Sequence, residues 1–140
     1  MIANSIDKIN LRKMATSYIE EAMPKLPYHN AQHAKEVAAL AVHLGVMEGC
    51  NPDELFLLEM AGLFHDVIYM ISAPKAENEN LSADQAYSYF KRDFKEEELV
   101  TLKELIKATI WPYETEPKNK LEMIIRDADL GNTGTDSYEA

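Results

Sequence analysis

The chain has 140 residues and a formal net charge of −10, with 14 basic against 24 acidic residues. This length suits one domain with a single core, which we expect to span residues 1–140. The acidic balance argues against binding a nucleic-acid duplex, because phosphate backbones are recognised by clustered Lys and Arg. It still permits a phosphorylated substrate if a metal ion supplies local positive charge.

Targeting signals are missing from the sequence. Cys50 is its one cysteine, so no disulfide framework is indicated. The first residues are charged throughout and lack the apolar stretch of a signal peptide. No run approaches the roughly 18 apolar residues of a membrane span. We therefore expect a cytoplasmic protein with no membrane partner.

Apolar residues recur with a helical period along the first half of the chain. Helices are expected at about 4–22 and about 30–48. Asn51 and Pro52 predict the start of a third helix, as an N-cap followed by proline at the first helical position. The apolar stripe of this third helix consists of Leu58, Ala61 and Phe64.

The second half shows the same periodicity after a polar stretch at 67–80, which is expected to be a loop. Two helices are expected at 82–92 and 93–110, the second opened by a capping box of Asp93 and Glu96. After a loop at 111–118, a last amphipathic helix runs from Leu121 to Ala128 and beyond. No alternating strand pattern occurs, so the sequence predicts an all-α fold.

Three of these apolar stripes end in residues that can bind a metal. His33 begins the stripe of the second helix, and His65 continues that of the third and is followed by Asp66. Asp129 continues the stripe of the last helix. If the three helices pack together, two histidines and two aspartates converge.

Burying these groups without partners costs several kcal/mol, so a divalent cation is one way to satisfy them. The mixed nitrogen and oxygen set suits Mn, Fe, Co, Ni, Zn or Mg. Each residue alone also has a structural explanation: His33 can be a cap or core residue, and Asp127 and Asp129 can simply end a helix. Their joint placement at the ends of stripes favours a metal site.

Three motifs in order extend this hypothesis: "YHNAQHAKEVAALA", "MAGLFHDVIY" and "RDADLGNTG". With them the chain resembles the HD superfamily of metal-dependent phosphohydrolases over about residues 17–134. The segment "NENLSADQA" at 78–86 is similar to one that follows the HD motif in a subgroup of small bacterial HD proteins. "YHNAQHA" and "ADL" are also similar to motifs of cyclic-nucleotide phosphodiesterases.

The resemblance implies a compact bundle of about five to seven helices and a divalent metal as cofactor. Its ligands fall on His33, His65, Asp66 and Asp129. We expect one ion, or one tight and one weak, because His43 lies ten residues after His33 and about 80° away around the helix.

The implied mechanism is attack on phosphorus by a metal-activated water, with Asp66 contacting both metal and water. The general-acid position falls on His29, whose alternative is an exposed histidine near a helix start. Glu79 could hydrogen-bond a ligand, and Asp127 is a second candidate for that role. Asn30 is expected to cap the second helix. Candidates for holding phosphate oxygens are Lys75, Lys107 and Arg126.

The leading functional hypothesis is therefore a phosphohydrolase acting on a nucleotide or another small phosphorylated metabolite. The alternatives are a cyclic-nucleotide phosphodiesterase, a non-catalytic sensor of metal or nucleotide, and a helical interaction domain. Trp111 and Tyr113 could stack on a base, although loop aromatics more often pack against the protein. A homodimer could form through Tyr87, Tyr89 and Phe90, although a core role suits these aromatics better.

Two features depart from the family pattern. Met70 stands where the subgroup usually has an aspartate, which weakens any role assigned to that loop. Only eleven residues follow Asp129, whereas family members generally continue into further helix, so the chain is either naturally short or truncated.

Overall fold

The computed structural model describes the backbone of residues 5–139 and the side chains of residues 7–131. Within this part the chain forms six helices and no extended strand, which confirms the all-α prediction. The helices are α1 (Ser5–Ala22), α2 (Ala31–Met47), α3 (Pro52–Phe64), α4 (Glu77–Phe90), α5 (Glu96–Lys107) and α6 (Lys120–Glu139). None of the described helices is long and apolar enough to cross a bilayer.

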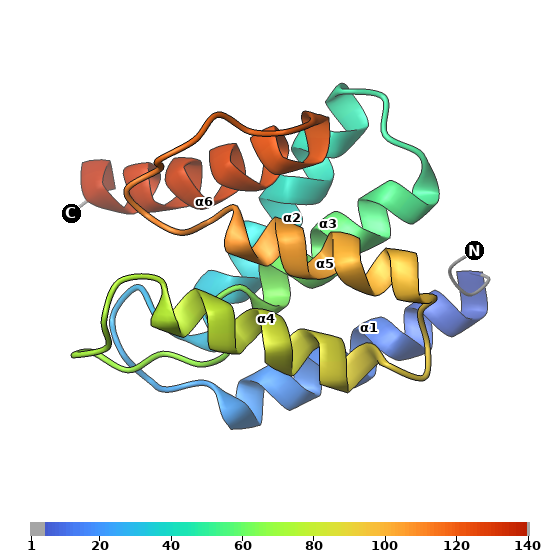
Figure 1. Cartoon of the computed structure of the whole chain (residues 1–140), viewed down its shortest axis with the longest axis horizontal. Helices are drawn as coiled ribbons and strands as arrows, with labels where there is room; N and C mark the ends of the chain where they lie inside the picture. Colours follow the sequence, from blue (N-terminus) through green and yellow to red (C-terminus); the bar gives the residue numbers. More distant parts are fainter. Residues whose placement is uncertain (1–4, 140) are drawn as a thin grey trace.

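Helix α3 lies at the centre of the bundle and contacts all five other helices. In Figure 1 it runs between α6 at the top and α1 and α4 at the bottom. The buried side chains of α3 lie on every face of the helix and not along one stripe. This is expected for a helix that other helices surround. Its residues from Met60 to Phe64 are all buried.

Asn51 caps the start of α3, as its sequence predicts, and the cap is part of a capping box. The Asn51 side chain accepts a hydrogen bond from the Glu54 N–H at 2.8 Å, and Glu54 accepts one from the Asn51 N–H at 2.9 Å. Asn30 caps α2 in the same way, since its Oδ1 accepts from the His33 N–H at 2.8 Å. These caps satisfy backbone donors that have no partner within the helix.

Two predicted helix starts are wrong. Helix α4 begins at Glu77 rather than 82, which shortens the preceding loop, and α5 begins at Glu96 and ends at Lys107. The expected capping box of Asp93 and Glu96 is not formed; Glu98 instead accepts a hydrogen bond from the Lys95 N–H at 2.8 Å. The reason is Phe94, whose ring stacks on Phe90 at 4.7 Å between centroids and keeps this segment in the core as a turn.

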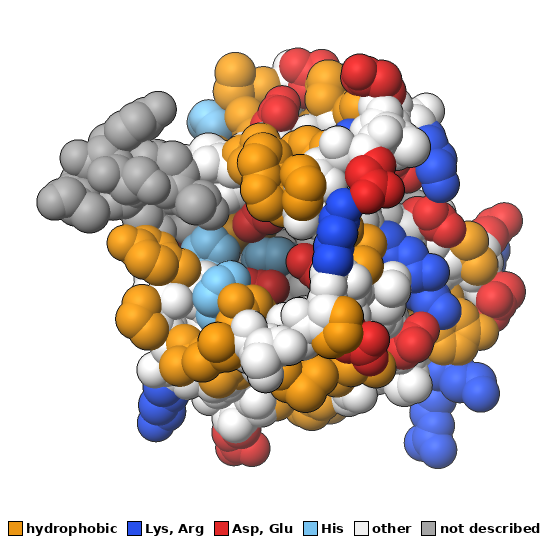
Figure 2. Space-filling view, turned by 60° about the vertical axis from the view of Figure 1, so that its left-hand side comes forward, with side chains coloured by type: hydrophobic (Ala, Val, Ile, Leu, Met, Phe, Trp, Pro, Cys, Tyr) orange, Lys and Arg blue, Asp and Glu red, His pale blue; other side chains and the backbone are white. Residues whose placement is uncertain are grey.

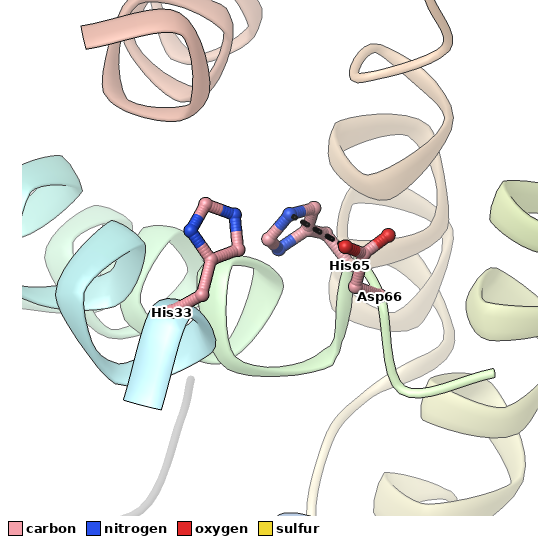
Figure 3. Close-up of side chains that lie close together, drawn as sticks. All are labelled: His33, His65 and Asp66. Carbon is pink, nitrogen blue, oxygen red and sulfur yellow. Dashed lines mark ion pairs between the residues drawn. The ribbon is translucent and has the colours of Figure 1, made fainter. Parts of the chain in front are cut away.

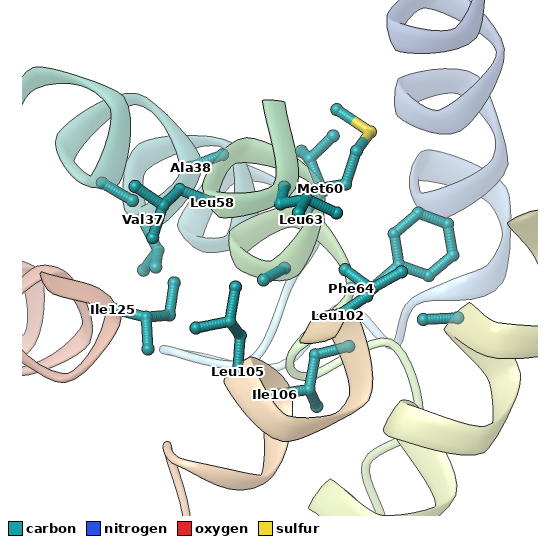
Figure 4. Close-up of a cluster of buried hydrophobic side chains, with 14 of the residues drawn as sticks. Val37, Ala38, Leu58, Met60, Leu63, Phe64, Leu102, Leu105, Ile106 and Ile125 are labelled. Atoms are coloured by element: carbon teal, nitrogen blue, oxygen red, sulfur yellow. The ribbon is translucent and has the colours of Figure 1, made fainter. Parts of the chain in front are cut away.

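A close crossing of α2 and α3 positions the start of α2, which carries His33, and the end of α3, which precedes His65. A β-carbon added to Gly62 would lie 2.7 Å from the Cα and 2.9 Å from the N of Ala38. Only glycine permits this approach. Beside the crossing, Figure 4 shows Val37, Leu105 and Ile125 meeting in the core between α2, α5 and α6.

The aromatic residues of α4 pack within the chain. Phe90 is fully buried, and the Tyr89 ring lies 4.8 Å from that of Tyr18 and 5.2 Å from that of Phe64. The Tyr87 hydroxyl donates a hydrogen bond to Glu96 at 2.5 Å. These contacts support the core interpretation, and the homodimer remains a prediction.

Candidate metal centre

Two helix ends bring three potential metal ligands together. His33 lies in the first turn of α2, whereas His65 and Asp66 follow the last residue of α3. All three are buried, and each offers a donor atom within 4.8 Å of those of the other two. Figure 3 shows the two imidazole rings side by side, with the Asp66 carboxylate beyond His65.

The fourth predicted ligand reaches this cluster from α6. Asp129 Oδ1 lies 3.3 Å from His65 Nε2 and 3.7 Å from His33 Nε2. The convergence expected from the stripe ends is therefore present in the structure. That these four residues bind a metal remains a prediction.

Hydrogen bonds orient the cluster for an incoming ion. His65 Nδ1 lies 2.7 Å from the Gly62 carbonyl oxygen and donates to it, so Nε2 is the ring nitrogen that faces Asp129 and is available to a metal. His33 Nδ1 is buried without a hydrogen-bond partner among the described residues. The set of two imidazoles and two carboxylates fits a divalent cation, and the His33 nitrogen that faces the cluster is Nε2, not the buried Nδ1.

The charge balance of the cluster also fits a divalent cation. Burial alone would lower the pKa of His65, but the negative charges of Asp129 and Asp66 outweigh it and raise this pKa to about 10. Burial opposes ionisation of Asp129, yet His65 and His33 hold its pKa below the usual range. Without metal, a proton on His65 partly neutralises the carboxylates, and a cation can take over that role.

A cavity of about 530 Å³ opens onto the cluster, within the range of about 300–1,000 Å³ typical of small-molecule sites. Figure 2 shows histidine and acidic side chains at the base of this hollow and hydrophobic side chains around it. The lining residues are Tyr28, His29, His33, His65, Asp66, Tyr69, Glu79, Thr109, Trp111, Asp129 and Leu130.

His29 also reaches the cavity, but from a loop. Helix α2 begins at Ala31, so His29 and His33 do not share a helical face. His29 Nδ1 lies 2.7 Å from Asp66 Oδ2, and its ring stacks on Tyr69 with centroids 3.7 Å apart. This predicted general acid is therefore held beside a predicted metal ligand.

A family model for the HD domain matches residues 30–130, more than half of the chain. The chain belongs to the HD domain family. The matched range includes the two histidines and two aspartates of the cluster. No curated protein and no solved structure gives a significant match. HD domains form a family of metal-dependent phosphohydrolases that bind divalent metals, and the cluster of this HD domain fits that chemistry.

Helix α4 of this HD domain contributes both to the cavity and to its support. Glu79 lines the cavity and is half-buried, and burial raises its pKa. Asn78 exchanges two hydrogen bonds with the backbone of Met70, at 2.9 and 3.0 Å. Ser82 does the same with Ile68, at 3.0 and 3.1 Å. This pair clamps the loop that carries Tyr69.

The roles of Asn78 and Ser82 were missed at the sequence level, although their spacing of four residues within "NENLSADQA" is a signal for one helical face. The clamp also explains how the loop tolerates Met70. The Asn78 side chain hydrogen-bonds the backbone N–H and carbonyl of Met70, whereas the Met70 side chain is exposed.

Several predicted site residues are not brought to the cavity. The Arg126 guanidinium donates to the carbonyl oxygens of Ala108 and Thr115, at 2.9 and 2.8 Å. Lys75 forms an ion pair with Glu114. Lys107 and Asp127 do not line the cavity either, and neither does His43. Asp127 and His43 are exposed.

Other residues line the cavity without having been assigned to it from the sequence. Tyr28 and Tyr69 flank the two histidine motifs and could have been flagged on that ground. Leu130 directly follows Asp129 in the last motif and could have been flagged in the same way, whereas Thr109 carries no such signal. Of the two loop aromatics proposed to stack, Trp111 lines the cavity, whereas Tyr113 packs against the Arg126 guanidinium at 4.3 Å.

Proposed function

We propose that this HD domain is a metal-dependent hydrolase of phosphate esters of small metabolites. One observation carries the proposal: two imidazoles and two carboxylates converge from three helices at the base of an open cavity. His33, His65, Asp66 and Asp129 would hold the ion, which when bound lowers the pKa of water and stabilises negative charge on the phosphoryl oxygens.

His29 is proposed to donate the proton to the leaving oxygen. Its Nδ1 is held by Asp66 at 2.7 Å, which leaves Nε2 as the nitrogen for proton transfer. Stacking on Tyr69 fixes the plane of the ring.

This pairing favours an ester over an anhydride. An alkoxide is a poor leaving group and requires a proton, whereas a departing phosphate is already a stable anion. The same need arises in a cyclic phosphodiester, so cyclic-nucleotide hydrolysis is the second candidate function.

The proposal is tested by elemental analysis after loading with Mn²⁺, together with a screen of phosphate esters. We expect about one equivalent of metal and hydrolysis of at least one ester, both lost in His65→Ala and Asp129→Ala. His43→Ala is the matched control, because this histidine is exposed on α2 outside the cluster. Metal binding with no turnover of any ester would favour a sensor instead.

A further inference from the structure

The cavity has two unlike parts. Its base carries the metal-binding candidates and Glu79, whereas its mouth carries Tyr28, Trp111 and Leu130. These three side chains are 47%, 63% and 43% exposed. A single exposed apolar residue is ordinary, but several around one polar cavity mark a surface for an apolar group of a ligand. Figure 2 shows hydrophobic side chains around much of the hollow and one basic side chain at its right-hand edge.

No basic side chain completes the lining. All 14 lysines and arginines lie between residues 8 and 126, where side chains are described, and none lines the cavity. Lys75, on the loop that also carries Tyr69, is engaged by Glu114. Arg126 is held by the backbone carbonyls of Ala108 and Thr115.

The electrostatic consequence is a limit on phosphate number. A divalent cation held by Asp66 and Asp129 can coordinate one phosphate directly, but each additional phosphate brings further negative charge toward these carboxylates and Glu79, and no basic side chain of the lining meets it. Sites for phosphate chains usually meet this charge with Arg or Lys. Without them, like charges in a partly dry cavity repel strongly.

We propose, building on the hydrolase function above, that the ligand is a nucleotide with a single phosphate, bound with that phosphate at the metal cluster and its base against Trp111. Trp111 and Tyr28 are then the residues that hold the base. Every base has a π face, so such stacking tolerates different bases.

The reaction balances without a further reactant. A water oxygen bonds to phosphorus, and the bond between phosphorus and the sugar oxygen breaks. One proton of the water is transferred in net terms to the sugar oxygen, which gives a nucleoside hydroxyl and inorganic phosphate. In a cyclic nucleotide the same step opens the ring.

Trp111 is the one tryptophan of the chain, so its fluorescence reports binding directly. The probes are AMP, cyclic AMP, ATP and ribose 5-phosphate, added to protein loaded with Mg²⁺, which does not itself quench. We expect saturable quenching by AMP or cyclic AMP, binding of ATP weaker by about tenfold or more, and little change with ribose 5-phosphate. The first two arms separate a monoester from a cyclic diester.

Turnover gives the second readout. Trp111→Ala should lower the ratio of kcat/KM for AMP to that for ribose 5-phosphate by about 5- to 150-fold, the range expected for one base–aromatic stack. Trp111→Phe should restore most of it. Ile71→Ala is the control, because Ile71 is an exposed apolar residue of the α3–α4 loop that does not line the cavity.

The two proposals fail in different ways. Equal binding and turnover of AMP and ATP, or an unchanged substrate ratio in Trp111→Ala, would overturn the single-phosphate nucleotide while leaving the hydrolase function intact. Quenching by AMP without hydrolysis of any ester would support the ligand class and overturn the hydrolase function.

Discussion

The carboxylates at the α1–α3 contact and those at the candidate metal centre have different partners. Along the contact of α1 with α3, each carboxylate faces a basic side chain. Lys8 lies 3.0 Å from Asp53, and Arg12 donates two hydrogen bonds to Glu59, at 2.6 and 2.9 Å.

At the metal centre, Asp66 and Asp129 face histidines, and Glu79 carries a raised pKa because of burial. No basic residue among the described side chains balances them there. The α1–α3 contact is thus neutralised by folding alone, whereas the centre keeps a charge deficit that a bound cation can fill. The site thus differs from the α1–α3 contact in that its carboxylates face histidines instead of Lys or Arg.

The largest effect is expected from Asp66→Asn, which keeps the shape of the side chain and removes its charge. Metal affinity should fall by more than about 100-fold, beyond the loss typical of residues that only support a ligand. Elemental analysis and metal titration measure it. Asp127→Asn, an exposed carboxylate of α6 away from the cavity, should retain its metal. Equal losses of metal affinity in Asp66→Asn and Asp127→Asn would mean that the carboxylates of the centre do not differ from exposed ones in metal binding.

His29→Gln should separate catalysis from metal binding. Loss of a general acid lowers kcat by about 10²- to 10⁴-fold, while His33, His65, Asp66 and Asp129 remain to hold the ion. Steady-state kinetics on the best ester and metal content are measured together, with His43→Gln as the control. Unchanged kcat would remove His29 from the mechanism.

Gly62→Ala tests the helix crossing that sets the distance between His33 and His65. The added β-carbon would meet backbone atoms of Ala38 at 2.7 and 2.9 Å, so the helices must separate. We expect a loss of about 1–3 kcal/mol in the free energy of unfolding, and weaker metal binding. Gly131→Ala, whose β-carbon would meet only a side-chain carbon of Leu40 at 3.3 Å, is the control in urea unfolding.

The metal-free protein should show a specific dependence of stability on pH. The pKa of His65 rises from 6.5 to about 10 on folding, so its contribution is complete below pH 6.5 and is lost as the pH rises toward 10. The lowered pKa of Asp129 contributes above about pH 4 and is lost as the pH falls.

Unfolding of chelator-treated protein from about pH 2 to pH 10 measures this profile. His65→Asn should remove the decline on the alkaline side. A decline of the same size in this variant would trace it to other groups.

The smallest effect is expected at the α1–α3 contact. Arg12→Met should destabilise the fold by about 1 kcal/mol or less, because the pair with Glu59 is partly exposed and solvent screens it. Thermal unfolding measures the change, and metal content should stay at the wild-type value. A loss of metal in this variant would mean that the two regions are coupled.

The sequence by itself determined the helical class and the four donor positions. Helical periodicity places residues on faces, and the continuation of an apolar face into His33, His65 or Asp129 already implies burial beside other helices. The start of α3 was equally predictable, because the Asn51 cap depends only on residues within one turn.

Only the tertiary structure decided the rest. Phe94 moved the start of α5 because its ring packs against Phe56 of α3, and Asn78 acts as a clamp only because Met70 folds back to it. Arg126 is drawn to the carbonyls of the α5–α6 loop, and His29 is brought to Asp66 across 37 residues of sequence. Local patterns fix which face a side chain occupies; its partner depends on long-range packing, and that packing decided which charges reach the cavity.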